Sequence, residues 1–140
     1  MIRVDHDELE PTKDHLSLTY KDKPFTGIGY ERDDNGNLIS EICYKEGQKD
    51  GVTKEWFVNG KISLEENYRN NTLHGSCRKW YETGVLESEE IYELGICIRR
   101  KVWSEDGTEI EDYLIDENSP QFGTLQKLRQ STIGKHIMSK

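Results

Sequence analysis

The sequence contains few apolar residues and no long apolar run. Of its 140 residues, 33% are hydrophobic and 33% are charged, and the mean hydropathy is −0.88. A globular domain normally carries a larger apolar share, and low hydrophobicity with a net charge of −8 is also typical of disordered chains. Against disorder, three Trp, seven Tyr and three Phe recur at regular positions. We therefore expect one ordered domain with a thin core and a large surface.

Signals for export and membrane insertion are missing as well. The opening "MIRVDHDELE" has neither a basic nor an apolar segment, so no signal peptide is expected. No apolar run approaches the roughly 20 residues that span a bilayer. The cysteines, Cys43, Cys77 and Cys97, are odd in number and lack metal-binding spacing. They are expected to be reduced thiols in a cytoplasmic protein.

Residues for catalysis or cofactor binding form no recognisable pattern. The four histidines are isolated, and no Ser or Cys lies in a nucleophile motif. There is no phosphate-binding glycine loop, and "DDNGN" has the wrong spacing for an EF-hand calcium loop. We expect a protein that is not an enzyme and that holds no cofactor and no metal.

Positive charge is scarce outside the last 22 residues. Residues 119–140 contain Lys127, Arg129, Lys135 and Lys140 and no acid, so residues 1–118 hold the other 15 bases against all 27 acids, a net charge of −12. Such a body repels nucleic acid phosphates and anionic lipid headgroups. A basic protein is the expected partner, and the sequence does not give the oligomeric state.

An internal repeat of 24 residues is the strongest pattern that is present. Glycine, leucine or isoleucine, glutamate, tryptophan and tyrosine all keep this spacing. The matching residues are Gly27, Gly51 and Gly75; Gly36, Gly60 and Gly84; Leu38, Ile62 and Leu86; Glu41, Glu65 and Glu89; Trp56 and Trp80; and Tyr20, Tyr44, Tyr68 and Tyr92. Trp103 and its turn at Gly107 continue the series one residue short.

Each copy of the repeat predicts a β-hairpin. "VTKEWF" and "KISLEENY" are rich in β-branched and aromatic residues, and Asn59-Gly60 between them is a strong signal for a tight turn. The fold class is therefore all-β, an antiparallel meander of hairpin repeats. Residues 1–118 form the repeat region, with units near 15–27, 27–51, 51–75, 75–98 and 99–113. The hairpin register, which decides whether Trp56 or Phe57 joins the apolar row, stays open.

The repeat pattern stops after Tyr113, and residues 119–140 are expected to differ in structure. Ser119 is a suitable N-cap and Pro120 suits the first helical position, while Phe122, Leu125 and Leu128 have helical spacing. A short helix is expected to cap one end of the sheet, or to lie on its face, and to hide an exposed edge. The basic segment after it, residues 134–140, is expected to be a flexible tail.

Two rows of side chains follow from the alternation along each strand. The tyrosines and most repeated aliphatic residues fall on one face, and Glu41, Glu65 and Glu89 fall on the other with Ser63 and Glu87. Taken singly, each glutamate is explained as part of a solvated face. Taken together, they predict a line of negative charge about 20 Å long that attracts a basic protein. The candidate partner-binding residues are Glu41, Glu65, Glu89, Trp56, Trp80, Glu87 and Glu66.

The segments "KPFTGIGYERDDNGNLISEICYKEGQKDG" and "NGKISLEENYRNNTLHG" resemble the MORN repeat variants of bacterial proteins, over roughly residues 15–113. The chain departs from that pattern at Arg32, where later copies carry Trp, and at Arg99, where Gly is expected. The resemblance implies an immunity protein or antitoxin that neutralises a cognate toxin, such as a basic nuclease, by covering its active site. The alternative is a structural scaffold or a membrane-apposed interaction protein.

Overall fold

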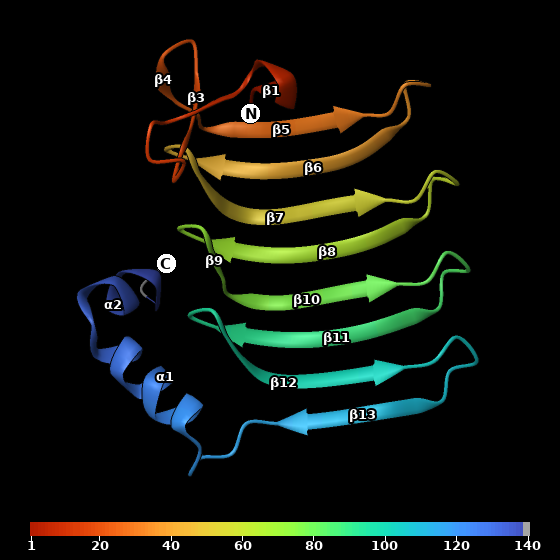
Figure 1. The fold of residues 1–140 in the computed structure, drawn as a ribbon, viewed down its shortest axis with the longest axis vertical. Helices are drawn as coiled ribbons and strands as arrows, with labels where there is room; N and C mark the ends of the chain where they lie inside the picture. Colours follow the sequence, from red (N-terminus) through yellow and green to blue (C-terminus); the bar gives the residue numbers. More distant parts are fainter. Residues whose placement is uncertain (139–140) are drawn as a thin grey trace.

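The computed structural model of the protein describes residues 1–138, and these residues fold around one large β-sheet (Figure 1). The sheet has ten strands, ordered β1-β5-β6-β7-β8-β10-β11-β12-β13, with β9 paired to β8 beside this path. The strands are β1 (Arg3–Asp5), β5 (Gly27–Arg32), β6 (Leu38–Lys45), β7 (Gln48–Trp56), β8 (Ile62–Arg69), β9 (Thr72–Leu73), β10 (Gly75–Trp80), β11 (Leu86–Glu93), β12 (Ile96–Trp103) and β13 (Glu109–Leu114). All pairs are antiparallel except β1 with β5. The predicted all-β meander is confirmed.

The hairpin turns lie where the repeat places them. At the turn between β7 and β8, the N–H of Gly60 donates to the carbonyl of Phe57 at 2.9 Å, and Gly60 has a φ of 86°, which favours glycine. The same bond recurs in the other three hairpins, at Gly36, Gly84 and Gly107. Because these turns are set by local residue types, the 24-residue period in the sequence becomes a two-strand period in the sheet.

A β-bulge recurs in each of the four hairpins, next to the turn. The register shifts between Glu55 and Trp56 opposite β8, so that Ser63 is an extra residue without a partner of its own. Equivalent shifts place extra residues at Ile39, Glu87 and Ile110. A bulge changes the direction of the side chains beside it. The simple alternation assumed from the sequence therefore fails at these positions.

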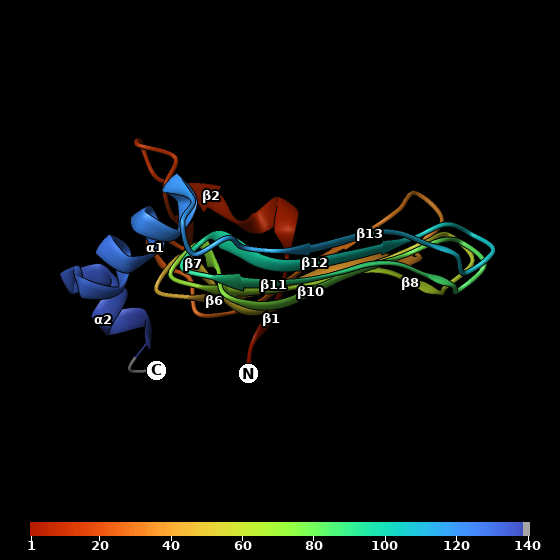
Figure 2. The same ribbon diagram turned by 90° about the horizontal axis from the view of Figure 1, so that it is seen from below.

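The N-terminal segment covers part of one face of the sheet (Figure 2). It contains the 3₁₀ helix η1 (His6–Glu8) and a separate three-stranded sheet of β2 (Glu10–Pro11), β3 (Leu18–Tyr20) and β4 (Lys23–Pro24). Val4, Leu9, Phe25 and Tyr44 form its buried core. The partial repeat before Gly27 thus forms a hairpin outside the large sheet, because β1 takes the place beside β5.

Two helices, α1 (Pro120–Gln130) and α2 (Thr132–Met138), follow the last strand. Ser119 caps α1 as expected, with its Oγ accepting a hydrogen bond from the N–H of Phe122 at 3.2 Å. Leu125 and Ile137 pack with Leu94 in the turn between β11 and β12. The helices therefore lie beyond the ends of these strands and not along β13, so the expectation that they hide the edge is wrong (Figures 1 and 2).

The C-terminal segment is helical up to Met138. Residues 134–138 of the segment that we expected to be flexible belong to α2, and Ser139 and Lys140 lie outside the described residues. Within residues 1–138, neither helix has the length and apolar character that crossing a bilayer requires. All three cysteines are free thiols.

We expect the stability of the fold to decrease in acid because of carboxylates in the turns. Hydrogen bonds from Ser104 and Thr108 lower the pKa of Asp106 to about 2, and hydrogen bonds from Asn37 and Asn35 lower the pKa of Asp33. Since these folded-state pKa values lie below the ordinary 3.8, the stabilisation is complete above pH 3.8 and is lost as the pH falls through the folded values. Melting temperatures between pH 5 and pH 2 check this.

The variant Asp106→Asn tests whether the Asp106 carboxylate causes part of this acid dependence, and it keeps the turn. The equivalent Asn59 uses its Oδ1 to accept from the N–H of Lys61 at 2.9 Å, as Asp106 does from Thr108. The variant is therefore expected to fold normally and to lose part of the acid dependence. Asp34→Asn is the matched control, because Asp34 accepts no hydrogen bond from another described residue. An unchanged acid slope in Asp106→Asn would contradict the prediction.

Candidate partner-binding surface

The two faces of the large sheet carry different residues, as the register shows. On one, which we call the tyrosine face, Tyr44, Tyr68 and Tyr92 are each paired across the strands with a glycine. The other, which we call the ladder face, carries Glu41, Glu65 and Glu89, three residues earlier on the same strands. The predicted separation of tyrosines and glutamates onto opposite faces is confirmed.

The tyrosine face holds a repeated pair of a tyrosine and a glutamate. The hydroxyl of Tyr68 donates to Glu66 at 3.1 Å, and that of Tyr92 donates to Glu90 at 2.9 Å. Burial first, and then Glu90, raises the pKa of Tyr92 to about 12. Glu66, a predicted partner-binding residue, therefore lies on this face and is engaged by Tyr68, two residues along its own strand.

The ladder face does not carry the predicted line of negative charge. Lys54 lies between Glu41 and Glu65 in the register, because it is paired with both. Arg78 and Lys101 continue the alternation as neighbours of Glu65, Glu89 and Asp112. Arg78 Nε also contacts Glu89 Oε2 at 2.8 Å. Acids and bases thus alternate from strand to strand, and cross-strand attraction replaces the expected negative field.

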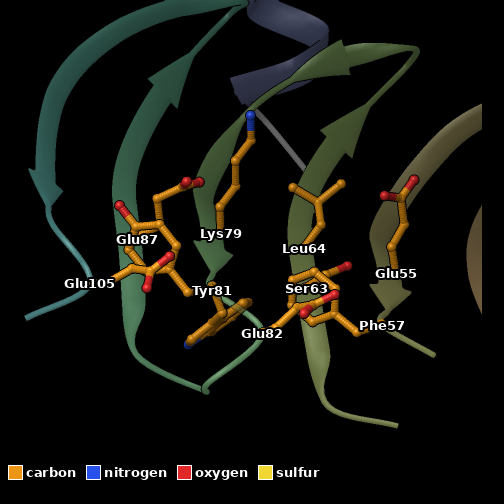
Figure 3. Close-up of a pocket in the computed structure, with 10 residues that line it drawn as sticks. Glu55, Phe57, Ser63, Leu64, Lys79, Tyr81, Glu82, Glu87 and Glu105 are labelled. Carbon is orange, nitrogen blue, oxygen red and sulfur yellow. The ribbon is translucent and has the colours of Figure 1, made fainter. Parts of the chain in front are cut away.

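A shallow hollow of about 560 Å³ opens on the tyrosine face near the hairpin turns (Figure 3). Leu64 lines the hollow and lies four residues before Tyr68 on β8, so alternation along the strand places both side chains on the same face. Lys79 on β10 is paired with Leu64 in the register and also lines the hollow. The walls combine aromatic and acidic side chains from three successive hairpins. These are Phe57, Trp80 and Tyr81, with Glu55, Glu82, Glu87 and Glu105.

The β-bulge explains why Glu87 reaches this hollow. Strict alternation places Glu87 and Ser63 on the ladder face with Glu41, and that expectation is wrong. Each is the extra residue of a bulge, and both line the hollow with Leu64. Figure 3 shows Glu87 and Ser63 on the same side as Leu64 and Lys79.

Hydrogen bonding fixes the aromatic wall of the hollow. The hydroxyl of Tyr81 donates to the carbonyl of Trp103 in the next hairpin at 2.8 Å. Burial, with Glu87 and Glu105 nearby, raises the pKa of Tyr81 above its ordinary value. The hydrogen bond therefore ties the ring to the next repeat.

The acids of the hollow differ from Glu41 and Glu89 of the ladder face because they form no ion pair among the described residues. Within the described residues, none of Glu55, Glu82, Glu87 and Glu105 forms an ion pair, whereas Glu41 and Glu89 both do. Unpaired carboxylates beside aromatic rings suit a cationic side chain, because it is attracted both by the carboxylates and by the face of the ring. No group of side chains in residues 1–138 is arranged to hold a metal ion.

The predicted site residues are therefore divided among four places. Glu87 and Trp80 line the hollow, Glu66 lies beside Tyr68 on the tyrosine face, and Glu41, Glu65 and Glu89 lie on the ladder face. Trp56 lines a second, smaller depression one repeat away. Sequence reasoning missed Glu55, Phe57, Tyr81, Glu82 and Glu105. An aromatic pair precedes two successive turns, Trp56-Phe57 and Trp80-Tyr81, and this recurrence is the signal that could have found Phe57 and Tyr81.

Comparison with known proteins agrees with the hairpin architecture. A family model described as MORN repeat variant matches residues 25–46, 49–70 and 73–93, which contain the hairpins β5–β6, β7–β8 and β10–β11. No curated protein matched the chain. A solved structure described as "Crystal structure of GtfA/B complex bound to UDP and GlcNAc" matched at 14% identity and a TM-score of 0.32, over 87% of this chain and only 26% of that one. Residues 25–93 thus contain three consecutive MORN repeat variants.

Proposed function

We propose that this chain is a non-enzymatic protein-binding module whose hollow takes a Lys or Arg side chain of a basic protein. The observation that carries the proposal is the group of four unpaired glutamates around Trp80 and Tyr81. On the ladder face, by contrast, Glu65 and Glu89 face bases directly across the strands. The hollow is thus a place where negative charge is left for a partner.

Binding would combine short-range and long-range attraction. A guanidinium or ammonium group in the hollow would lie against an aromatic face and donate charge-assisted hydrogen bonds to Glu82 and Glu87. The net charge of −12 over residues 1–118 would steer a basic protein toward the sheet before contact. Among residues 1–138, no second layer covers the sheet beyond its N-terminal part, so a partner can lie flat across the remaining tyrosine face (Figure 2).

We propose further that the partner is a toxin and that the chain acts as its immunity protein. The resemblance to bacterial MORN repeat variants supports this role, and the acidic surface suits a basic nuclease. Neutralisation would work by occlusion: the sheet would cover the basic substrate cleft of the toxin, with the hollow holding one of its cationic side chains. No chemical step by the immunity protein is required.

The test is co-purification with the protein encoded by the neighbouring gene, followed by measurement of the dissociation constant. The double variant Glu82→Gln with Glu87→Gln removes two charges from the hollow and is expected to weaken binding about 100-fold, at roughly 1.4 kcal/mol for each contact. Asp34→Asn with Glu46→Gln removes the same charge from exposed sites outside the hollow and is the matched control.

The control separates local contacts from long-range steering. It is expected to change the association rate slightly and the dissociation rate not at all. Equal weakening by both double variants would contradict the role of the hollow. If the neighbouring protein does not bind and does not poison cells, the immunity role is wrong, whatever the hollow binds.

A further inference from the structure

The alternating charges of the ladder face end unevenly at β13. Glu65 lies between Lys54 and Arg78, and Glu89 lies between Arg78 and Lys101, so each has a base on both sides. Asp112, on the last strand, has Lys101 on its inner side and no strand on its outer side among the described residues. The ladder thus stops at an acid with one side open.

At the opposite edge of the sheet, the last acid of the ladder face has a base on both sides, and both bases belong to this chain. Glu41 has Lys54 on one side and Tyr30 on the other. Arg3, carried by the edge strand β1, reaches over the ring of Tyr30 at 5.3 Å and forms an ion pair with Glu41. A cation from an added strand therefore completes the ladder at this edge.

The β13 edge is otherwise uncovered. Ile110 and Leu114 are 64% and 65% exposed, and the helices pack on the turn between β11 and β12 instead. The N–H of Ile115 donates inward to Ile98 at 3.0 Å. Because successive N–H groups of a strand point to opposite sides, those of Leu114 and Asp112 point outward. Two donors and two apolar side chains are thus available at the edge.

We propose that β13 binds an extended basic segment of a partner protein, which adds to the sheet as a further strand. Its backbone would accept from the N–H groups of Asp112 and Leu114. A Lys or Arg opposite Asp112 would continue the alternation of the ladder face, and an apolar residue would cover Leu114.

Charge favours such a segment over a second copy of this chain. Pairing of β13 with another β13 would bring Glu109, Glu111 and Asp112 against the same acids, and like charges across strands are destabilising. Pairing with a basic strand has a precedent inside the molecule. On its inner side, β13 contacts β12 through Arg99 with Asp112 at 3.2 Å and Lys101 with Glu109 at 3.6 Å.

The probe that follows is a labelled peptide with the sequence of β12, residues 96–103, in which Cys97 is replaced by Ser. Titration of the full chain with this peptide at low salt is expected to give saturable binding by fluorescence anisotropy. In amide exchange measured by NMR, the N–H groups of Asp112 and Leu114 are expected to become protected. A peptide with Glu in place of Arg99, Arg100 and Lys101 is expected not to bind.

Three variants separate the contributions of backbone pairing, side-chain contact and charge. Leu114→Pro removes one outward N–H and leaves the inner ladder intact, and it is expected to weaken the peptide at least about tenfold. Leu114→Ala keeps the N–H and loses only the side chain, with an expected loss of about threefold. Asp112→Lys is expected to weaken binding about tenfold and covers the case in which the proline variant does not fold.

Three outcomes would overturn the proposal. They are no saturable binding, binding that survives both Leu114→Pro and Asp112→Lys, and a dimer of the chain that the proline variant converts to monomer. The Glu82→Gln and Glu87→Gln variant of the hollow is expected to bind the peptide normally. If one of the two proposals is wrong, binding at the hollow or binding at the β13 edge, these variants therefore show which one it is.

Discussion

Replacing Phe25 with alanine is expected to lower the free energy of unfolding by about 3–5 kcal/mol. Phe25 is 2% exposed, and its ring lies 5.7 Å from that of Tyr44 and 6.0 Å from that of Tyr20. It joins the N-terminal segment to β6, and Val4 and Leu9 belong to the same core. Removing the ring leaves a cavity where two parts of the chain meet, and the thin core offers little else to fill it.

Urea denaturation followed by circular dichroism measures this loss. Phe57→Ala is the matched control, because Phe57 lies half-buried on the wall of the hollow and not in either buried core. Its expected cost is about 1 kcal/mol, in proportion to the smaller apolar area that it loses. Similar losses in the two variants would mean that the N-terminal segment does not stabilise the sheet.

The repeated hairpins could be predicted from the sequence because the signals that form them are local. Asn59-Gly60 specifies its turn without reference to distant residues, and the same is true one and two repeats away. Once the turns are known, the pairing of neighbouring strands follows. The antiparallel meander therefore required only the 24-residue period and the residues of the turns.

The directions of individual side chains near the turns could not be predicted in the same way. A bulge shifts the register by one residue, and such a shift moves a side chain to the other face. Strict alternation therefore predicts Glu87 and Ser63 on the ladder face, whereas both line the hollow. The hollow itself combines three hairpins, so no single repeat reveals it.

The alternating charges of the ladder face could have been predicted from the sequence. Lys54 and Arg78 are 24 residues apart, as Glu65 and Glu89 are, so the bases repeat with the same period as the acids. Comparing both strands of each hairpin, with the register of an ideal pair, would have placed the bases between the acids. The N-terminal cover is different, because "MIRVDHDELE" shows no periodicity and its parallel pairing with β5 depends on contacts distant in the sequence.

Replacing Leu125 with alanine is expected to release the C-terminal helices without unfolding the sheet. Leu125 is fully buried, at 0% exposure, and packs with Leu94 and Ile137. A buried Leu→Ala change costs about 2–5 kcal/mol. Strand pairs in a repeat array depend mainly on their neighbours, so this loss is expected to fall on α1, α2 and the turn that they cover.

Two probes that report different parts of the molecule test this prediction. Circular dichroism at 222 nm follows the helices, and tryptophan fluorescence follows the strands, since all three tryptophans lie in β7, β10 and β12. In Leu125→Ala the helical signal is expected to melt first and the fluorescence transition to shift by only a few degrees. Gln126→Ala, on the exposed side of α1, is expected to melt like the unchanged protein. A single transition, shifted equally in both probes, would show instead that the helices and the whole sheet unfold as one cooperative unit.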